Sequence, residues 1–202
     1  ISFEAGNEFR HFEISNLDFF SENVDSIYLK GITKKSDHNV LSSCEPESVN
    51  KNFFFATLKK DYSRNENKYF NKYDLNGKMA IKNNRSNYPE YESEYIITEF
   101  CLEKELEENS NVYIFGAISN WNIDEKYKMQ YDMKSKKYYK NLLLKQGYYD
   151  YQYITTNLNA NLIEGNYFET RNEYTIYVYH KPIWSRYEKI IGINKITSNY
   201  LD

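Results

Sequence analysis

The stretch that decides the fold is VYIFGAISNWN at residues 112–122, followed by LLLKQGYYDYQYI at 142–154. The first stretch alternates like a strand and stops at Gly116, after which a polar loop carries Trp121. The second stretch holds an apolar strand, a turn at Gly147 and a strand whose odd positions from 149 to 153 are all tyrosine. Because side chains alternate across a strand with period two, these tyrosines share one face. The spacing predicts a β-sandwich.

Strand-like segments of similar length recur along the rest of the chain, separated by polar stretches that favour loops. Between the two halves, residues 103–111 are charged and polar with no apolar period to bury. We therefore expect an all-β protein made of two immunoglobulin-like β-sandwich domains in tandem, residues 1–104 and 105–202, the first either whole or incomplete at its N-terminus. The expected strands lie near 8–14, 24–32, 38–43, 52–59, 78–83, 93–103, 111–118, 126–133, 137–144, 148–156, 173–181 and 186–197. The core of the second domain is expected to contain Val112, Ile114, Leu142, Leu144, Ile176 and Val178.

Composition narrows the class of protein. The 202 residues are 41% hydrophobic and 18% aromatic, which is ample for a packed core. With 26 basic and 29 acidic residues spread along the chain, the net charge of −3 gives no electrostatic footprint for nucleic acid or anionic lipid. No apolar run approaches the roughly 18–20 residues that span a bilayer. We expect no nucleic-acid partner and no membrane-spanning segment.

No assembled catalytic, metal or cofactor motif is present in the sequence. The three histidines are scattered, and neither a Gly-x-Ser-x-Gly elbow, a His-Glu-x-x-His pair nor a phosphate loop accompanies them. A glycosidase would need two carboxyl groups facing each other at roughly 5–10 Å, and Asp124, Glu125 and Glu164 are the carboxylates to weigh. They fall in expected loops, where solvated charges and turn caps are the rule. We expect no enzyme, no cofactor and no bound metal.

Cys44 and Cys101 allow one disulfide bond. Two lone cysteines do not make the framework of a small secreted fold, and a buried free cysteine behaves as a small hydrophobe. The sequence leaves open whether the two cysteines are bonded to each other or free. The N-terminus lacks the basic region and apolar core of a signal peptide, and because the chain starts at Ile1 we expect a fragment of a longer protein.

The order of parts around Trp121 resembles the early-set immunoglobulin-like modules, which include the glycogen-binding domains of kinase β subunits and branching enzymes. In those modules a platform tryptophan follows the Gly-x-Phe-Asn motif, and Trp121 with Asn122 occupies the matching place. The resemblance implies stacking of a sugar ring on the indole. The second platform of those modules has no counterpart, because residues 154–162 read ITTNLNANL. Trp121 therefore either contacts α-glucan or, as we favour, packs over the end of the sandwich.

Over a longer span the chain resembles one family. FEAGNEFRHFEI at 3–14, VYIFGAISNWNIDEKYKMQYD at 112–132, the stretch at 142–154 and EGNYFETRNEYTIYVYHKPIWSRYEKIIGI at 164–193 are similar to the C-terminal portion of the type IX secretion system plug proteins of Bacteroidetes, formerly a domain of unknown function. The resemblance covers most of the chain and is weakest between residues 34 and 91. It implies a signal peptide and another domain ahead of this portion, a periplasmic location at the outer membrane, and one partner. That partner is the outer-membrane translocon, a very large β-barrel whose periplasmic opening the plug closes.

Exposed aromatic side chains are the candidate contacts for such a partner. Trp184 follows Pro182 in HKPIWSRYEK, where it either anchors a partner or covers the open end of the core. Tyr177 and Tyr179 share the strand face opposite Ile176, so they form either a protein-contact surface or cross-strand tyrosine pairs. The candidate partner- or sugar-contacting residues are Trp121, Asn122, Trp184, Tyr177 and Tyr179. The sequence leaves the oligomeric state open.

Overall fold

The computed structural model describes residues 6–17, 23–32, 51–66, 69, 74–106, 110–156 and 159–198. Strands dominate the described part, which makes the fold all-β as predicted. The expected strand at 38–43 and Cys44 lie outside the described residues, whereas Cys101 is a buried free thiol. The strands are β1 (Arg10–Ile14), β2 (Val24–Ile32), β3 (Lys51–Leu58), β4 (Asp61–Tyr62), β5 (Met79–Ile81), β6 (Tyr95–Glu103), β7 (Val112–Phe115), β8 (Gln130–Asp132), β9 (Lys137–Lys145), β10 (Gly147–Thr155), β11 (Glu173–His180) and β12 (Lys189–Thr197). The short helices are α1 (Pro89–Glu92), α2 (Asn161–Glu164), η1 (Ala117–Ser119) and η2 (Glu125–Tyr127).

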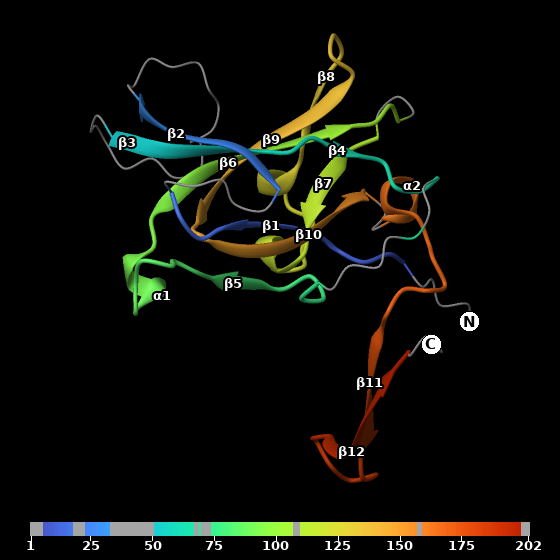
Figure 1. Cartoon of the computed structure of the whole chain (residues 1–202). Coiled ribbons are helices and arrows are strands. Elements are labelled where there is room, and N and C mark those ends of the chain that lie inside the picture. Colours follow the sequence, from blue (N-terminus) through green and yellow to red (C-terminus); the bar gives the residue numbers. More distant parts are fainter. Residues whose placement is uncertain are drawn as a thin grey trace.

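Two sheets stack on each other to form the body of the molecule (Figure 1). One sheet has the order β2-β3-β6-β9-β8, with β4 beside β6. The other has the order β1-β10-β5, and β7 also pairs with β10. The chain passes from one sheet to the other between β9 and β10. A side chain at Gly147 would place its Cβ 2.4 Å from the carbonyl oxygen of Ala80, so this crossing requires glycine.

The core lies between the two sheets and is rich in aromatic rings. Phe12 of β1 stacks on Tyr149 of β10, with centroids 5.2 Å apart, and meets Phe100 of β6 edge-on at 5.6 Å. Tyr149, Tyr151 and Tyr153 are all buried, so the tyrosine face read from the sequence is the core face of β10. Burying a large apolar side chain contributes about 1.5–3 kcal/mol, so this layer supplies much of the stability of the body.

The expected division into two domains is wrong. β6 lies before the expected boundary at 103–111, yet it pairs antiparallel with β9 along its full length, from Tyr95 opposite Lys145 to Glu103 opposite Lys137. β1 pairs in the same way with β10. Strands from both halves therefore share both sheets and one core. The charged stretch after β6 connects two strands of the same body, β6 and β7.

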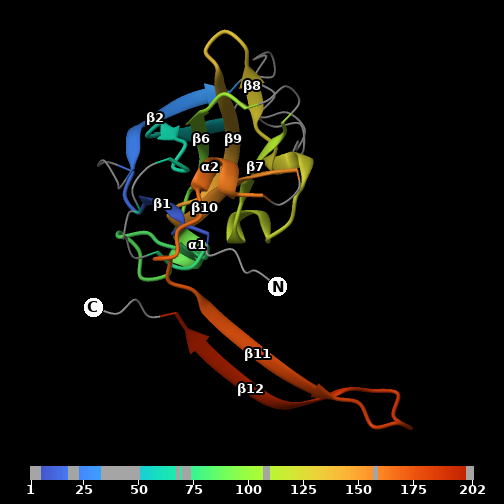
Figure 2. The ribbon, with the colours of Figure 1, turned by 90° about the vertical axis from the view of Figure 1, so that its right-hand side faces the viewer.

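β11 and β12 form a separate two-stranded sheet that projects away from the body (Figures 1 and 2). We call this unit the hairpin. Val112, Ile114 and Leu142 are buried and Leu144 packs against the core as expected, but Ile176 and Val178 on the hairpin are 47% and 48% exposed. Their predicted core position is wrong because period-two spacing shows which residues share a face and not whether anything lies against it.

Candidate functional site

The five predicted contact residues lie in two separate places. Trp121 and Asn122 lie in the body, on the loop that follows η1. Tyr177 and Tyr179 lie on β11, and Trp184 lies in the loop that joins β11 to β12. The structure does not gather them into one site, so the body loop and the hairpin have to be judged separately.

Trp121 is held against the body by aromatic neighbours. Its ring meets Phe9 and Phe115 edge-on, at centroid distances of 5.9 and 5.6 Å, and 46% of the residue stays exposed. A Cβ at Gly77 would lie 2.4 Å from the indole, so glycine is required for this contact. Trp121 itself has a φ of 58°, and the side-chain amide of Asn122 donates to the carbonyl of Asn120 at 3.0 Å. The loop is thus fixed by packing and local hydrogen bonds, while part of the indole remains open to solvent.

A buried carboxylate supports the turn beneath this loop. Asp150 of β10 is fully buried, and its Oδ2 accepts from the backbone N–H groups of Leu75 and Gly77. Burial and the neighbouring Asp74 raise the pKa of Asp150 to about 6, although the backbone N–H groups act in the opposite direction. Asp74 in turn accepts from the backbone N–H of Phe9. Sequence reasoning missed this turn anchor, whose one signal was an aspartate inside a tyrosine-rich strand.

The hairpin exposes apolar side chains on both of its faces. Tyr177 pairs with Ile193 across the strands, and directly opposite residues share a face. On the other face lie Ile176 and Val178. Tyr177 is 52% exposed and Tyr179 57%, and at the far end Trp184 is 96% exposed. Exposed apolar side chains on both faces make the hairpin a candidate interaction surface.

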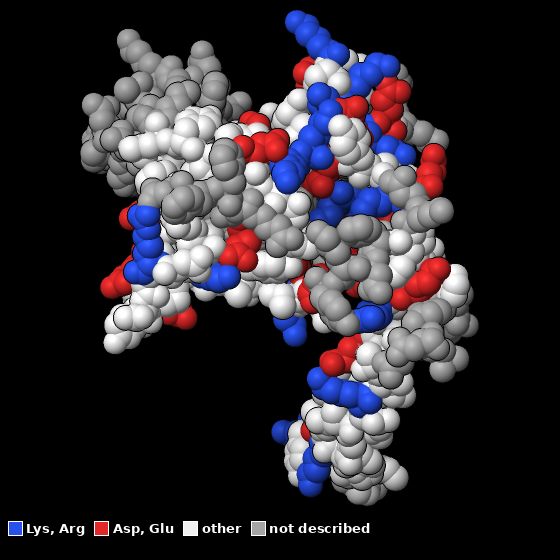
Figure 3. Space-filling view, in the orientation of Figure 1, with Lys and Arg blue, Asp and Glu red and all other residues white. Residues whose placement is uncertain are grey.

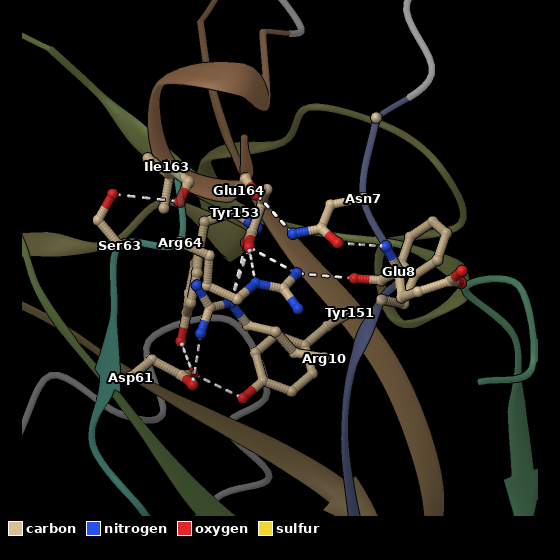
Figure 4. Close-up of polar contacts among 12 residues, drawn as sticks. Asn7, Glu8, Arg10, Asp61, Ser63, Arg64, Tyr151, Tyr153, Ile163 and Glu164 are labelled. Atoms are coloured by element: carbon tan, nitrogen blue, oxygen red, sulfur yellow. Dashed lines mark hydrogen bonds and ion pairs between the residues drawn. The ribbon is translucent and has the colours of Figure 1, made fainter. Parts of the chain in front are cut away.

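Four charged side chains form a partly buried cluster at the edge of the body (Figure 4). We call it the ion cluster, and it consists of Arg10 on β1, Asp61 on β4, Arg64 just after β4 and Glu164 at the end of α2. Arg10 Nε donates to Glu164 at 3.0 Å, and its Nη1 donates to Asp61 at 2.8 Å. Arg64 donates to Glu164 at 2.7–2.8 Å. The two positive and two negative charges balance.

Tyrosines of β10 complete the ion cluster. The hydroxyl groups of Tyr151 and Tyr153 donate to Asp61 Oδ2 at 2.7 and 2.8 Å, and the backbone N–H of Tyr153 donates to Glu164 at 2.9 Å. Burial alone would raise the pKa of Glu164, but Arg10 and Arg64 outweigh it and hold the pKa below its usual value. Glu164 was one of the carboxylates weighed for catalysis. Its oxygens are instead occupied in joining α2 to the sheets.

The other two weighed carboxylates lie near the body loop. Asp124 caps η2 by accepting from the backbone N–H of Lys126 at 2.8 Å. Glu125 is exposed and lies 3.4 Å from Lys128. These contacts match the turn caps and solvated charges expected from the sequence.

Two hollows lie on the described part of the surface. A shallow hollow of about 830 Å³ lies beside β8, and one of about 300 Å³ opens over the ion cluster. Basic and acidic side chains are interspersed over the face seen in Figure 3. Within the part of the chain that the structure describes, no three His, Cys, Asp or Glu side chains are arranged to hold a metal ion. None of the helices in that part has the length and apolar character needed to cross a bilayer.

Comparisons with known proteins find the fold again but no assigned function. No protein-family model and no curated protein matches the chain. The structure is similar to the crystal structure of a hypothetical protein from Parabacteroides merdae ATCC 43184, with a TM-score of 0.80 and 34% sequence identity. The match covers 97% of this chain and 46% of that chain. The chain thus spans about half the length of the solved structure it resembles.

Proposed function

We propose that this chain works by binding, as part of a plug that closes the periplasmic side of the type IX secretion outer-membrane translocon. The observation that carries the proposal is the hairpin, which presents Trp184, 96% exposed, at the end of a projecting apolar arm. An exposed tryptophan with apolar neighbours is the typical anchor of a protein interface. The sequence resemblance to the plug proteins supplies the identity of the partner.

The body is built as a stiff unit, which suits a protein that closes an opening. Two stacked sheets share one aromatic core, and the ion cluster holds the N-terminal segment and α2 on the same body. A plug needs such a stiff unit and a wide complementary surface more than it needs a pocket. The neighbour from Parabacteroides merdae, a Bacteroidetes species, agrees with a protein of that phylum. The proposed location is the periplasm, at the outer membrane.

A carbohydrate-binding module is the second candidate. The observation in its favour is the half-exposed indole of Trp121 on the body loop. The neighbouring strand β10 ends without a second tryptophan platform. A weak surface site loses most of its stacking and hydrogen bonding when one platform is missing, which ranks this candidate lower.

The experiment is co-purification of the full-length protein with the translocon from envelope membranes, using the two tryptophans as a matched pair. Trp184→Ala should weaken the complex by roughly tenfold or more, equivalent to about 1.4 kcal/mol, because it removes the anchor. Trp121→Ala should leave the complex unchanged. A stable complex with an unrelated envelope protein instead, or equal binding by the Trp184→Ala variant, contradicts the assignment. Calorimetric binding of α-glucan that Trp121→Ala abolishes would favour the second candidate.

A further inference from the structure

The middle of the hairpin has the composition of strands that are covered on both sides. We call residues 176–179 of β11 with residues 190–194 of β12 the shaft. From Tyr174 to Tyr179 the strand carries no charge, and its side chains alternate between two apolar faces. Strands that are apolar on both faces are typical of sheets buried on both sides. A two-stranded hairpin by itself is marginally stable in water at best.

Against the described residues of the body, the side chains from Ile176 to Tyr179 of the shaft stay about half exposed, at 47–57%. Among the described residues, Ser198 and Asn172 close the base of the hairpin with hydrogen bonds of 2.8 Å, and next to them the backbone N–H of Arg171 donates to Glu8 of the body at 3.1 Å. Charged side chains collect at the two ends, with the Lys195–Glu173 ion pair near the base and Lys181 and Lys189 near the tip. Both views show the hairpin extending away from the sheets (Figures 1 and 2). Within the described part of the chain, Ile176 and Val178 on one face and Tyr177 and Tyr179 on the other are therefore open to solvent.

We propose that the shaft is a docking arm for a second folded unit of the same polypeptide, of the kind that the Parabacteroides merdae chain has outside the matched region. The match covers 97% of this chain, so it includes most of the hairpin, yet it covers only 46% of that chain. More than half of that polypeptide thus lies outside the match. The proposal goes beyond the translocon assignment, because that assignment uses the tip at Trp184 and leaves the shaft free.

A unit of the same polypeptide fits the shaft better than a second copy does. Two hairpins that paired edge to edge would extend the sheet but leave both apolar faces in water. An uncharged strand of aromatic and β-branched residues, such as 174–179, is an aggregation hazard whenever it is uncovered. A covalently linked unit is present at an effective concentration in the millimolar range, so it covers the shaft at any protein concentration. The surface that receives the shaft must be apolar and must reach both of its faces.

The test is hydrogen exchange, measured on the 202-residue chain and on the complete gene product, both purified without the translocon. In the 202-residue chain the shaft amides should exchange rapidly, because an isolated hairpin opens readily. In the complete product they should exchange roughly 100-fold slower or more. Ile176→Lys and Tyr177→Lys each put a charge on one face and should each abolish that protection. Tyr91→Lys, an equally drastic change on the exposed helix α1, should not.

Three results would overturn the proposal. Equal exchange rates in the two proteins would show that the shaft stays uncovered. Concentration-dependent protection in the 202-residue chain would assign the shaft to a second copy. A complete gene product with no further folded unit would have nothing that could cover the shaft. None of these results involves the translocon, so the proposed function is tested separately by co-purification.

Discussion

Glu164 shows how single charged residues hold this body together. Glu164→Gln would remove the buried carboxylate that Arg10 and Arg64 share and would leave Arg10 with Asp61 as its counter-charge. Removing one partner of a buried ion pair costs about 3–5 kcal/mol. The free energy of unfolding, measured in urea at pH 7, should fall by that amount. Glu125→Gln is the control, since this exposed carboxylate should change stability by less than about 0.5 kcal/mol. Equal effects of the two substitutions would contradict the structural role of the ion cluster.

Asp150 gives the stability of the protein an unusual pH dependence. Its pKa is raised from 3.8 to about 6, so the folded state holds the proton more tightly than the unfolded state does. The contribution of Asp150 is therefore most favourable below about pH 4 and is lost as the pH rises through 6. Glu164 has a lowered pKa in the folded state, so its contribution to stability is present at neutral pH and is lost as the pH falls.

Asp150→Asn should remove the part of the pH dependence that Asp150 causes. Unfolding free energies measured from pH 4 to pH 7 should diverge, with the native protein losing stability relative to the variant as the pH rises. The difference should amount to at most about 3 kcal/mol, since one pKa unit corresponds to about 1.4 kcal/mol. Parallel curves for the two proteins would show that the pKa of Asp150 is the same in the folded and unfolded states.

At the scale of elements, β7 and β11 look alike in sequence and differ in role. Both alternate with period two, but Ile114 of β7 is fully buried and Ile176 of β11 is half exposed. Ile114→Ala should therefore cost about 2–5 kcal/mol of the body's stability. Ile176→Ala should cost less than about 0.5 kcal/mol in the 202-residue chain. Thermal unfolding of the body measures the change in stability for both variants. A large loss of stability from Ile176→Ala would contradict this prediction, because it would mean that the hairpin packs on the body.

These two strands also show what the sequence could reveal about the elements. Alternation predicted where both strands lie, and it placed Tyr149, Tyr151 and Tyr153 on one face of β10. Only the structure shows that this face is the core face. It could not reveal that β6 pairs with β9 across the charged segment, because partners in a sheet are chosen by contacts between distant residues. For the same reason, the sequence could not show that the hairpin stands apart from the two sheets of the body. The sequence of an apolar strand is the same whether the residues that cover it belong to the body or to another unit.

For the candidate site, too, the sequence revealed some of the residues and missed others. Local sequence pointed to Trp121 and Trp184 as notable aromatic residues, and the structure shows one held by packing and the other exposed. The ion cluster had no local signature, since Arg10 and Glu164 are 154 residues apart. Only the folded sheets bring these side chains together. Residues whose role depends on a distant partner are the ones that sequence reasoning missed.

At the scale of the whole molecule, the account combines a stiff β-body with a projecting apolar arm. The body keeps its shape through the aromatic core and the ion cluster. The arm carries the exposed aromatic residues that we assign to binding. In this arrangement the proposed function depends on what the arm and the body contact.

The most direct test of the plug assignment is the permeability of the envelope to large solutes in a strain that lacks this protein. We expect a leaky envelope, because the translocon would then stand open whenever no substrate fills it. Expression of the full-length native protein should restore the barrier, and the Trp184→Ala variant should restore it less well. A deletion strain that retains an intact permeability barrier would contradict the proposed function.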